Sequence, residues 1–160
     1  MRIRAVPIVL IILVMITSGW TFGKKPQKPS LEQLRQAPEQ ITIGGTELVL
    51  ETYLWRDFMP MSPPGGRPLQ GVVKLRNPQG KPLPSGLQIT RVWVLRDQEV
   101  WETVPEHDTP GSTATQLERS LRNGPGWEPG KEVTVVAEVQ DATGKTYLLR
   151  ADRQVIQRTM

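Results

Sequence analysis

The chain has 160 residues and contains no cysteine. Disulfide bonds, thiolate metal sites and a lipid-modified N-terminal cysteine are therefore excluded, and the fold must be stabilised by its core alone. Histidine is almost as scarce, since His107 is the only one. Catalytic triads and most zinc centres need a histidine that the fold brings to its partners, so the composition offers little support for either.

The chain also lacks an excess of positive charge once its first 30 residues are set aside. It has 20 Lys and Arg against 16 Asp and Glu, which gives a net charge of +4. Five of the basic residues precede residue 30, which leaves 15 basic and 16 acidic residues in the remainder. Nucleic-acid binding needs a basic face that displaces counterions from phosphates. We therefore predict no nucleic-acid partner.

The one long hydrophobic run lies at the N-terminus. Arg2 and Arg4 precede the apolar stretch IVLIILVMI at residues 8–16. A basic start followed by an apolar segment is typical of a secretory leader. Residues 5–22 are short of the roughly 20 apolar residues that span a bilayer. We predict a signal peptide at residues 1–23. The alternative is that residues 5–22 are retained as an anchor in the cytoplasmic membrane. The protein is then exported, to the periplasm or beyond the cell.

Residues 24–44 have the composition of a linker with one short helical pattern. The linker begins as KKPQKP, which is charged, spaced by proline and without periodicity. Ser30 and Gln33 form a capping-box pattern, and Leu31 with Leu34 gives one turn of apolar face. A helix of this length is stable only when it packs on something. The sequence therefore leaves a short helix and an unstructured segment open.

From residue 45 onward the hydrophobic pattern has a period of two, as half-buried strands do. In the first such segment, residues 46–55, the leucines at 48, 50 and 54 alternate with charged and aromatic residues. Turn or proline-rich segments separate it from further predicted strands at 69–77, 87–96, 99–104, 115–121, 131–141 and 145–152. We therefore predict a single all-β domain over residues 45–160, built as an antiparallel sandwich of six to seven strands.

Residues 127–133 (WEPGKEV) resemble the turn that enters the sixth strand of fibronectin type III and related immunoglobulin-like domains. In those domains an apolar residue, a Pro-Gly pair and an aromatic residue anchor the corner. Trp127, Pro129 and Gly130 match this pattern and are assigned structural roles. Val133 departs from it, because tyrosine is usual at that position. The resemblance implies an immunoglobulin-like sandwich. With the N-terminal signal or anchor helix in front of it, the order of segments resembles that of exported bacterial proteins.

Trp93 is central in its predicted strand, where immunoglobulin-like folds have a core tryptophan. We expect it to face inward together with Ile89 and Leu95. Because such sandwiches host many unrelated functions, this resemblance informs the fold and says little about activity.

The remaining tryptophans supply the candidate binding residues. Trp55 lies at the end of its predicted strand beside Arg56, and Trp101 lies in a predicted hairpin. Indole side chains suit both sugar stacking and protein interfaces. We predict a non-catalytic accessory or binding module of the bacterial cell envelope that contacts another envelope protein or a glycan through Trp55, Arg56 and Trp101, without a cofactor.

A metal-handling protein is one alternative function. Met59 and Met61 offer thioethers, and His107 offers an imidazole. Such soft and intermediate ligands suit copper. This alternative requires the fold to bring the proline-rich segment that holds the methionines close to His107.

A hydrolase is the other alternative. Its carboxylates would come from Glu102, Asp108 or Glu118, with His107 beside them. Ser112 lacks the Gly-x-Ser-x-Gly elbow and lies only five residues from His107, so we interpret it as a turn residue. No recognisable catalytic motif supports this function.

Overall fold

The structure is a computed structural model that describes residues 27–107 and 110–160. The predicted leader at residues 1–23 and the candidate Asp108 lie outside these residues. Within the described part of the chain, no helix has the length and apolar character needed to cross a membrane.

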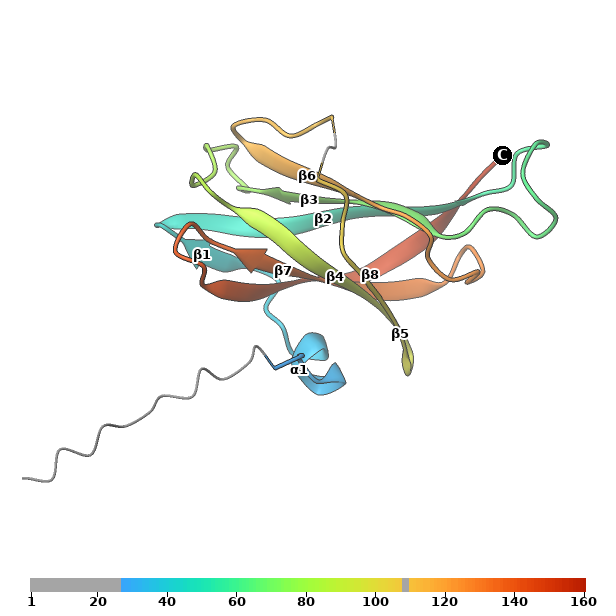
Figure 1. The fold of residues 1–160 in the computed structure, drawn as a ribbon, viewed down its shortest axis with the longest axis horizontal. Helices are drawn as coiled ribbons and strands as arrows, with labels where there is room; N and C mark the ends of the chain where they lie inside the picture. Colours follow the sequence, from blue (N-terminus) through green and yellow to red (C-terminus); the bar gives the residue numbers. More distant parts are fainter. Residues whose placement is uncertain (1–26, 108–109) are drawn as a thin grey trace, which may run out of the picture.

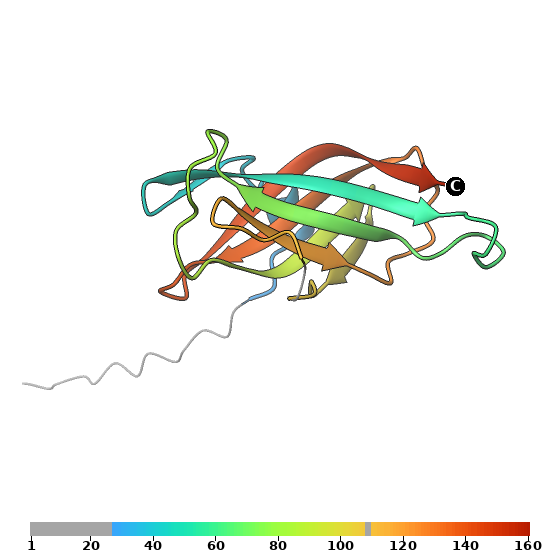
Figure 2. The same cartoon turned by 90° about the horizontal axis from the view of Figure 1, so that it is seen from above.

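The regular structure of the described residues consists almost entirely of strands. Its elements are α1 (Leu31–Arg35), β1 (Ile41–Ile43), β2 (Thr46–Asp57), β3 (Gln70–Arg76), β4 (Gln88–Arg96), β5 (Glu99–Thr103), β6 (Gln116–Leu121), β7 (Glu132–Gln140) and β8 (Thr146–Thr159). The strands form a curled mixed sheet in the order β5-β4-β7-β8-β2-β3-β6, and β1 pairs with the start of β2. Figures 1 and 2 show β2, β3 and β6 on one side of the curl and β4, β5 and β7 on the other.

The all-β class predicted from the alternating pattern is confirmed. Each of the seven predicted segments forms a strand, and the capping box at Ser30 is present at the start of α1. Two expectations need correction. The described residues hold eight strands rather than six or seven, because β1 was missed, and the sheet is not purely antiparallel.

The exception to antiparallel pairing arises where β8 passes from one side of the curl to the other. Its first part pairs with β7 in antiparallel fashion, whereas Ile156–Thr159 runs parallel to Leu54–Asp57 of β2. Arg153 has a positive φ of 53°, and the β7–β8 register shifts between Val133 and Val135. Such irregularities bend a strand and strengthen its twist. The sequence prediction stopped at residue 152 because the alternation is interrupted at this bend.

The main core lies inside the curl, where inward side chains from both sides meet. It includes leucines of β2 and β3, and valines of β4 and β7 that are fully buried. Trp127, which precedes β7, belongs to this core and lies under the guanidinium of Arg96, 4.9 Å from the ring centroid. The main core therefore takes its tryptophan from the corner before β7.

Trp93 is fully buried, but on the opposite face from the one expected. It forms a second, smaller cluster with Leu34, Leu95 and Val136 on the outside of the curl. The cause is a register shift in β4 between Ile89 and Arg91, which reverses the alternation of every later residue. Ile89 therefore faces the main core, whereas Trp93 and Leu95 face outward.

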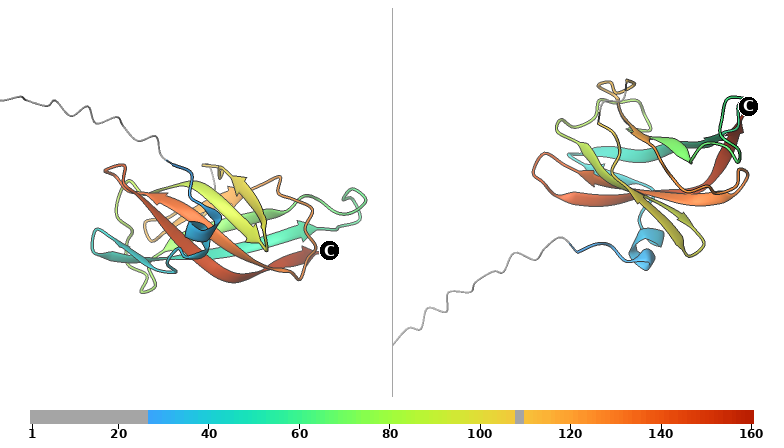
Figure 3. Two further views of the ribbon diagram at one scale, coloured as in Figure 1. Left: turned by 90° about the horizontal axis from the view of Figure 1, so that it is seen from below. Right: turned by 45° about the vertical axis from the view of Figure 1, so that its right-hand side comes forward.

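The N-terminal segment covers this second cluster. The α1 helix lies against the outer face of the β4–β7–β8 side in both views of Figure 3. Arg150 holds the segment after the helix, because its backbone N–H donates to Pro38 O over 2.8 Å and its Nε to Ala37 O over 2.9 Å. Before the helix, Lys28 forms an ion pair with Glu102 of β5. The predicted short helix therefore exists, and it packs on Trp93 through Leu34.

Replacing Leu34 by alanine should destabilise the protein by about 2–3 kcal/mol, because it opens a cavity over Trp93. The free energy of unfolding in urea measures this, and tryptophan emission should shift to longer wavelength as Trp93 becomes hydrated. Leu31→Ala is the matched control, since Leu31 is only half-buried on the same helix and should cost less. Equal losses for the two variants would contradict the packing.

Glu102 should make the docking of the N-terminal segment depend on pH. The hydrogen bond from Lys28, with a further one from Arg91, holds the pKa of Glu102 below its ordinary value. A carboxyl with a lowered pKa stabilises the folded state above its ordinary pKa and loses that effect as the pH falls through the folded value. Glu102→Gln should therefore cost about 0.5–1 kcal/mol at pH 7, and this cost should shrink as the pH falls through the lowered pKa of Glu102.

The measurement for this prediction is the free energy of unfolding from pH 7 to pH 2.5. Glu128→Gln serves as the control, because Glu128 is exposed in the turn before β7. A Glu102→Gln deficit that is equally large at both ends of the pH range would contradict the ion-pair contribution.

Candidate functional site

The outer face of β2, β3 and β6 carries an exposed pair of aromatic side chains. Tyr53 and Trp55 are two residues apart on β2, so both point away from the main core. Tyr53 is 52% exposed and Trp55 is half-buried. Their ring centroids lie 5.4 Å apart with an interplanar angle of 32°. Together the two rings form a small apolar shelf on an otherwise polar face.

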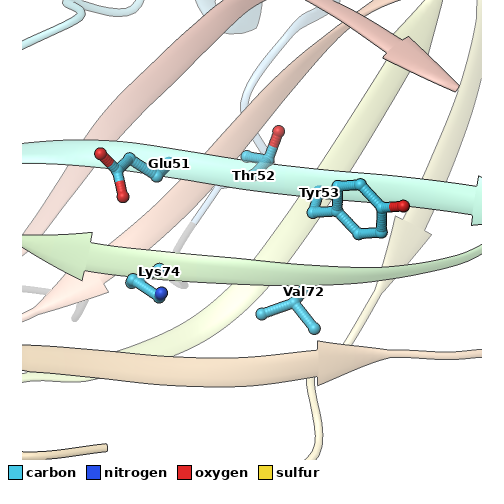
Figure 4. A pocket seen from close by; sticks show the side chains of 5 residues that line it. All are labelled: Glu51, Thr52, Tyr53, Val72 and Lys74. Carbon is cyan, nitrogen blue, oxygen red and sulfur yellow. The ribbon is translucent and has the colours of Figure 1, made fainter. Parts of the chain in front are cut away.

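A shallow hollow of about 160 Å³ adjoins this shelf. In Figure 4, Tyr53 and Val72 lie toward one end of the hollow and Glu51 and Lys74 toward the other. The register explains the arrangement, because Tyr53 pairs with Val72 and Glu51 with Lys74 across the β2–β3 ladder. The hollow therefore combines an apolar end with a charged end, each built from cross-strand neighbours.

The charges around the hollow are arranged in ion pairs across neighbouring strands. Arg76 donates to the carboxylate of Glu51, which lowers the pKa of Glu51 and raises the pKa of Arg76. Lys74 Nζ lies 3.6 Å from Glu118 Oε2 on β6. Two acidic and two basic side chains therefore balance one another beside the aromatic shelf.

Trp101 borders a different hollow, on the β5 side of the curl. This second hollow has a volume of about 480 Å³ and is lined by Trp101, Trp127, Val100 and the 123–125 segment. Trp101 is half-buried and packs against the main core. A Cβ at Gly124 would lie 2.8 Å from its ring, so the close approach of this segment requires glycine. Trp101 therefore packs against the main core at the edge of this hollow, whereas Trp55 lies on the outer face of β2.

Arg56 faces the interior, in contrast to Trp55 beside it. It is only 5% exposed, and its guanidinium donates to backbone carbonyl oxygens. The bonds run from Nε to Arg67 O (2.9 Å), from Nη2 to Gly65 O (2.6 Å) and from Nη1 to Gly126 O (3.0 Å) and Trp127 O (3.4 Å). Arg56 therefore does not line the aromatic shelf; it joins the β2–β3 connection to the segment before β7.

The β2–β3 connection, residues 58–69, is consequently held in a defined shape. Phe58 lies between two guanidinium groups, 5.0 Å from that of Arg56 and 4.2 Å from that of Arg158. Gly66 packs so closely on Phe58 that a Cβ there would lie 2.6 Å from the ring. Asp57 accepts a hydrogen bond from Met59 N and lies 3.4 Å from Arg67 Nε.

The residues of the two alternative functions are dispersed. Met59 and Met61 are exposed on the β2–β3 connection, whereas His107 is exposed beyond β5, next to a bridge between Glu106 and Ser120 of β6. Among the described residues, no three His, Asp or Glu side chains are placed to hold a metal ion.

The hydrolase candidates are also separated. Glu102 of β5 pairs with Lys28 and Arg91, whereas Glu118 of β6 pairs with Lys74, so the two carboxylates belong to different groups of ion pairs. Ser112 exchanges hydrogen bonds with the backbone of Glu118, as expected of a turn residue.

Comparison with known protein families, characterised proteins and solved structures gives no match. The candidate site therefore depends on the geometry of this chain. Tyr53 is the functional candidate that the sequence prediction did not select. The signal for it was available, because Tyr53 and Trp55 occupy alternate positions on the polar side of the same predicted strand.

Replacing Arg56 by lysine should cost about 2–4 kcal/mol of unfolding free energy, because one ammonium group cannot satisfy carbonyl oxygens on both connected segments. Urea denaturation measures the loss. Arg67→Lys is the matched control, since the Arg67 side chain is 49% exposed and its ion pair with Asp57 should contribute less than about 1 kcal/mol. Equal effects of the two substitutions would contradict the joining role of Arg56.

Proposed function

We propose that the protein is an exported, non-catalytic binding module with an immunoglobulin-like sandwich, and that the outer face of β2, β3 and β6 binds a glycan of the bacterial cell envelope. The basic and apolar leader pattern supports export. The sandwich is supported by the division of the strands into β2-β3-β6 and β5-β4-β7-β8, with the chain crossing between these groups after β3, β5 and β6.

The observation that carries the glycan proposal is the exposed shelf of Tyr53 and Trp55. Aromatic rings offer a flat apolar surface on which a pyranose ring can stack through its C–H groups. Glu51 and Lys74, at the other end of the hollow, provide an acceptor and a donor for sugar hydroxyl groups. The shelf and the hollow therefore present both kinds of group that a sugar needs.

The size and charge of the face favour a glycan over a protein partner. A stable protein interface buries about 800 Å² on each side with an apolar centre. Here the apolar part consists only of Tyr53, Trp55 and Val72. Its size suits a short run of sugar rings rather than the centre of a protein interface. The balanced ion pairs also favour an uncharged glycan, because a polyanion or polycation finds no net opposite charge. A binding role fits the carboxylates of Glu51 and Glu118 better than a catalytic one, because each is paired with a basic side chain.

A titration of the ¹⁵N-labelled protein with N-acetylglucosamine trimer and with cellotriose, followed by amide chemical shifts, tests the proposal. We expect saturable shifts in 51–55 and 70–74 with at least one of these sugars. Tyr53→Ala should weaken that binding about tenfold or more, which corresponds to about 1.4 kcal/mol. Because Tyr53 is exposed, this variant should remain folded.

Val100→Ala is the control, since Val100 is 41% exposed and lines the Trp101 hollow instead. It should leave sugar affinity unchanged. The proposal fails if neither sugar shifts the β2–β3 face, or if Val100→Ala weakens binding while Tyr53→Ala does not.

A further inference from the structure

All three methionines of the described residues lie at one end of the molecule. Met59 and Met61 belong to the β2–β3 connection, and Met160 follows β8. The parallel ladder pairs Asp57 with Thr159, and Phe58 N donates to Thr159 O over 2.9 Å. Figures 1, 2 and 3 all show the C-terminus beside the connection that follows β2. Residues about 100 positions apart in the sequence are therefore neighbours.

These methionines are not used for packing. Met59 is 50% exposed, Met61 is 89% exposed and Met160 is 81% exposed. Methionine ordinarily fills gaps in hydrophobic cores. Among the described residues, the main core contains leucine, isoleucine, valine, alanine and tryptophan but no methionine. The concentration of these methionines at one place calls for a role that uses the sulfur atoms.

The local backbone keeps the first two methionines close together. A turn joins Met59 O to Ser62 N over 2.7 Å, with Pro60 inside it. Proline restricts φ, so the turn loses little further freedom when its side chains are engaged. Arg56 and Asp57 hold the ends of the connection, as described above. Met59 and Met61 therefore lie on one turn, beside the strand end that Met160 follows.

The chemistry of this cluster is that of a soft cation site. Thioether ligands select Cu(I) among the common protein-bound metals. The chain has no cysteine, so methionine provides its only soft sulfur donors. The nearby charges favour a monovalent over a divalent ion. Arg56 and Arg158 lie on Phe58, next to Met59. The neighbouring carboxylate of Asp57 is already paired with Arg67. A positive surround opposes a divalent ion more strongly than a monovalent one.

We propose that Met59, Met61 and Met160 form a surface site for a soft monovalent cation, Cu(I), with Ag(I) as its stable analogue. This site is separate from the aromatic shelf and independent of the glycan proposal. It replaces the copper ligand set expected from the sequence, because Met160 takes the place of His107 as the third ligand.

The test is a titration of the whole chain with Ag(I), followed by the ¹³C–¹H signals of the methionine methyl groups, and a parallel Cu(I) titration against a chromophoric Cu(I) chelator. We expect the three methyl signals to shift together and to saturate at one ion per chain. Met59→Leu/Met61→Leu/Met160→Leu should abolish the saturable site, and Met61→Leu alone should weaken it about tenfold or more. Leucine preserves size at these exposed positions, so the fold should be retained.

Val104→Leu, at a position after β5 that is 65% exposed, is the control and should leave the affinity unchanged. The site is refuted if the triple variant still competes for Cu(I), if the three methyl signals respond independently without saturating, or if Zn(II) produces the same shifts. Sugar titration of the triple variant separates this proposal from the glycan proposal, because Tyr53 and Trp55 are intact in it.

Discussion

The parallel pairing of β8 with β2 is the constraint on which the rest of the structure depends. Four residues of each strand, Leu54–Asp57 and Ile156–Thr159, join the two sides of the curled sheet. On its inner face the junction places Arg56, and the carbonyl groups that Arg56 binds come from segments next to β3 and β7. On its outer end it brings the C-terminus to the β2–β3 connection. One short ladder therefore both closes the sheet around the core and brings the C-terminus next to the β2–β3 connection.

Adjacent residues of β2 have opposite roles because a strand turns successive side chains to opposite faces. Trp55 lies on the surface with Tyr53, and Arg56 is buried with its charge distributed over backbone carbonyl oxygens. Such hydrogen bonds compensate for the loss of water around a buried cation. The same arginine keeps the following connection rigid. The candidate binding shelf and the methionine cluster thus lie on either side of one buried anchor, yet they use different side chains and different chemistry.

Much of the fold was predictable, because alternation and turn residues are local properties of the sequence. Each of the seven predicted strands exists, and α1 begins at the predicted Ser30 cap. Apart from the missed three-residue β1, the errors arose where the pattern is interrupted by a single residue. The register shift after Ile89 turned Trp93 to the other face, and the bend at Arg153 concealed the last part of β8. The site was harder to predict, since Arg56 and Tyr53 are distinguished by the face they occupy, and Met160 is placed by pairing between distant strands.

The docked N-terminal segment has a consequence for the geometry of the protein at a membrane. Lys28 is held by Glu102 and α1 by the Trp93 cluster, so the globular part does not begin at the end of a loose linker. If the leader is retained as an anchor, only about five residues separate it from Lys28, and an extended chain spans at most about 3.6 Å per residue. Lys28 would then be confined to within about 20 Å of the bilayer. A retained leader would therefore keep the docked start of the domain, and Glu102 with it, close to the membrane surface.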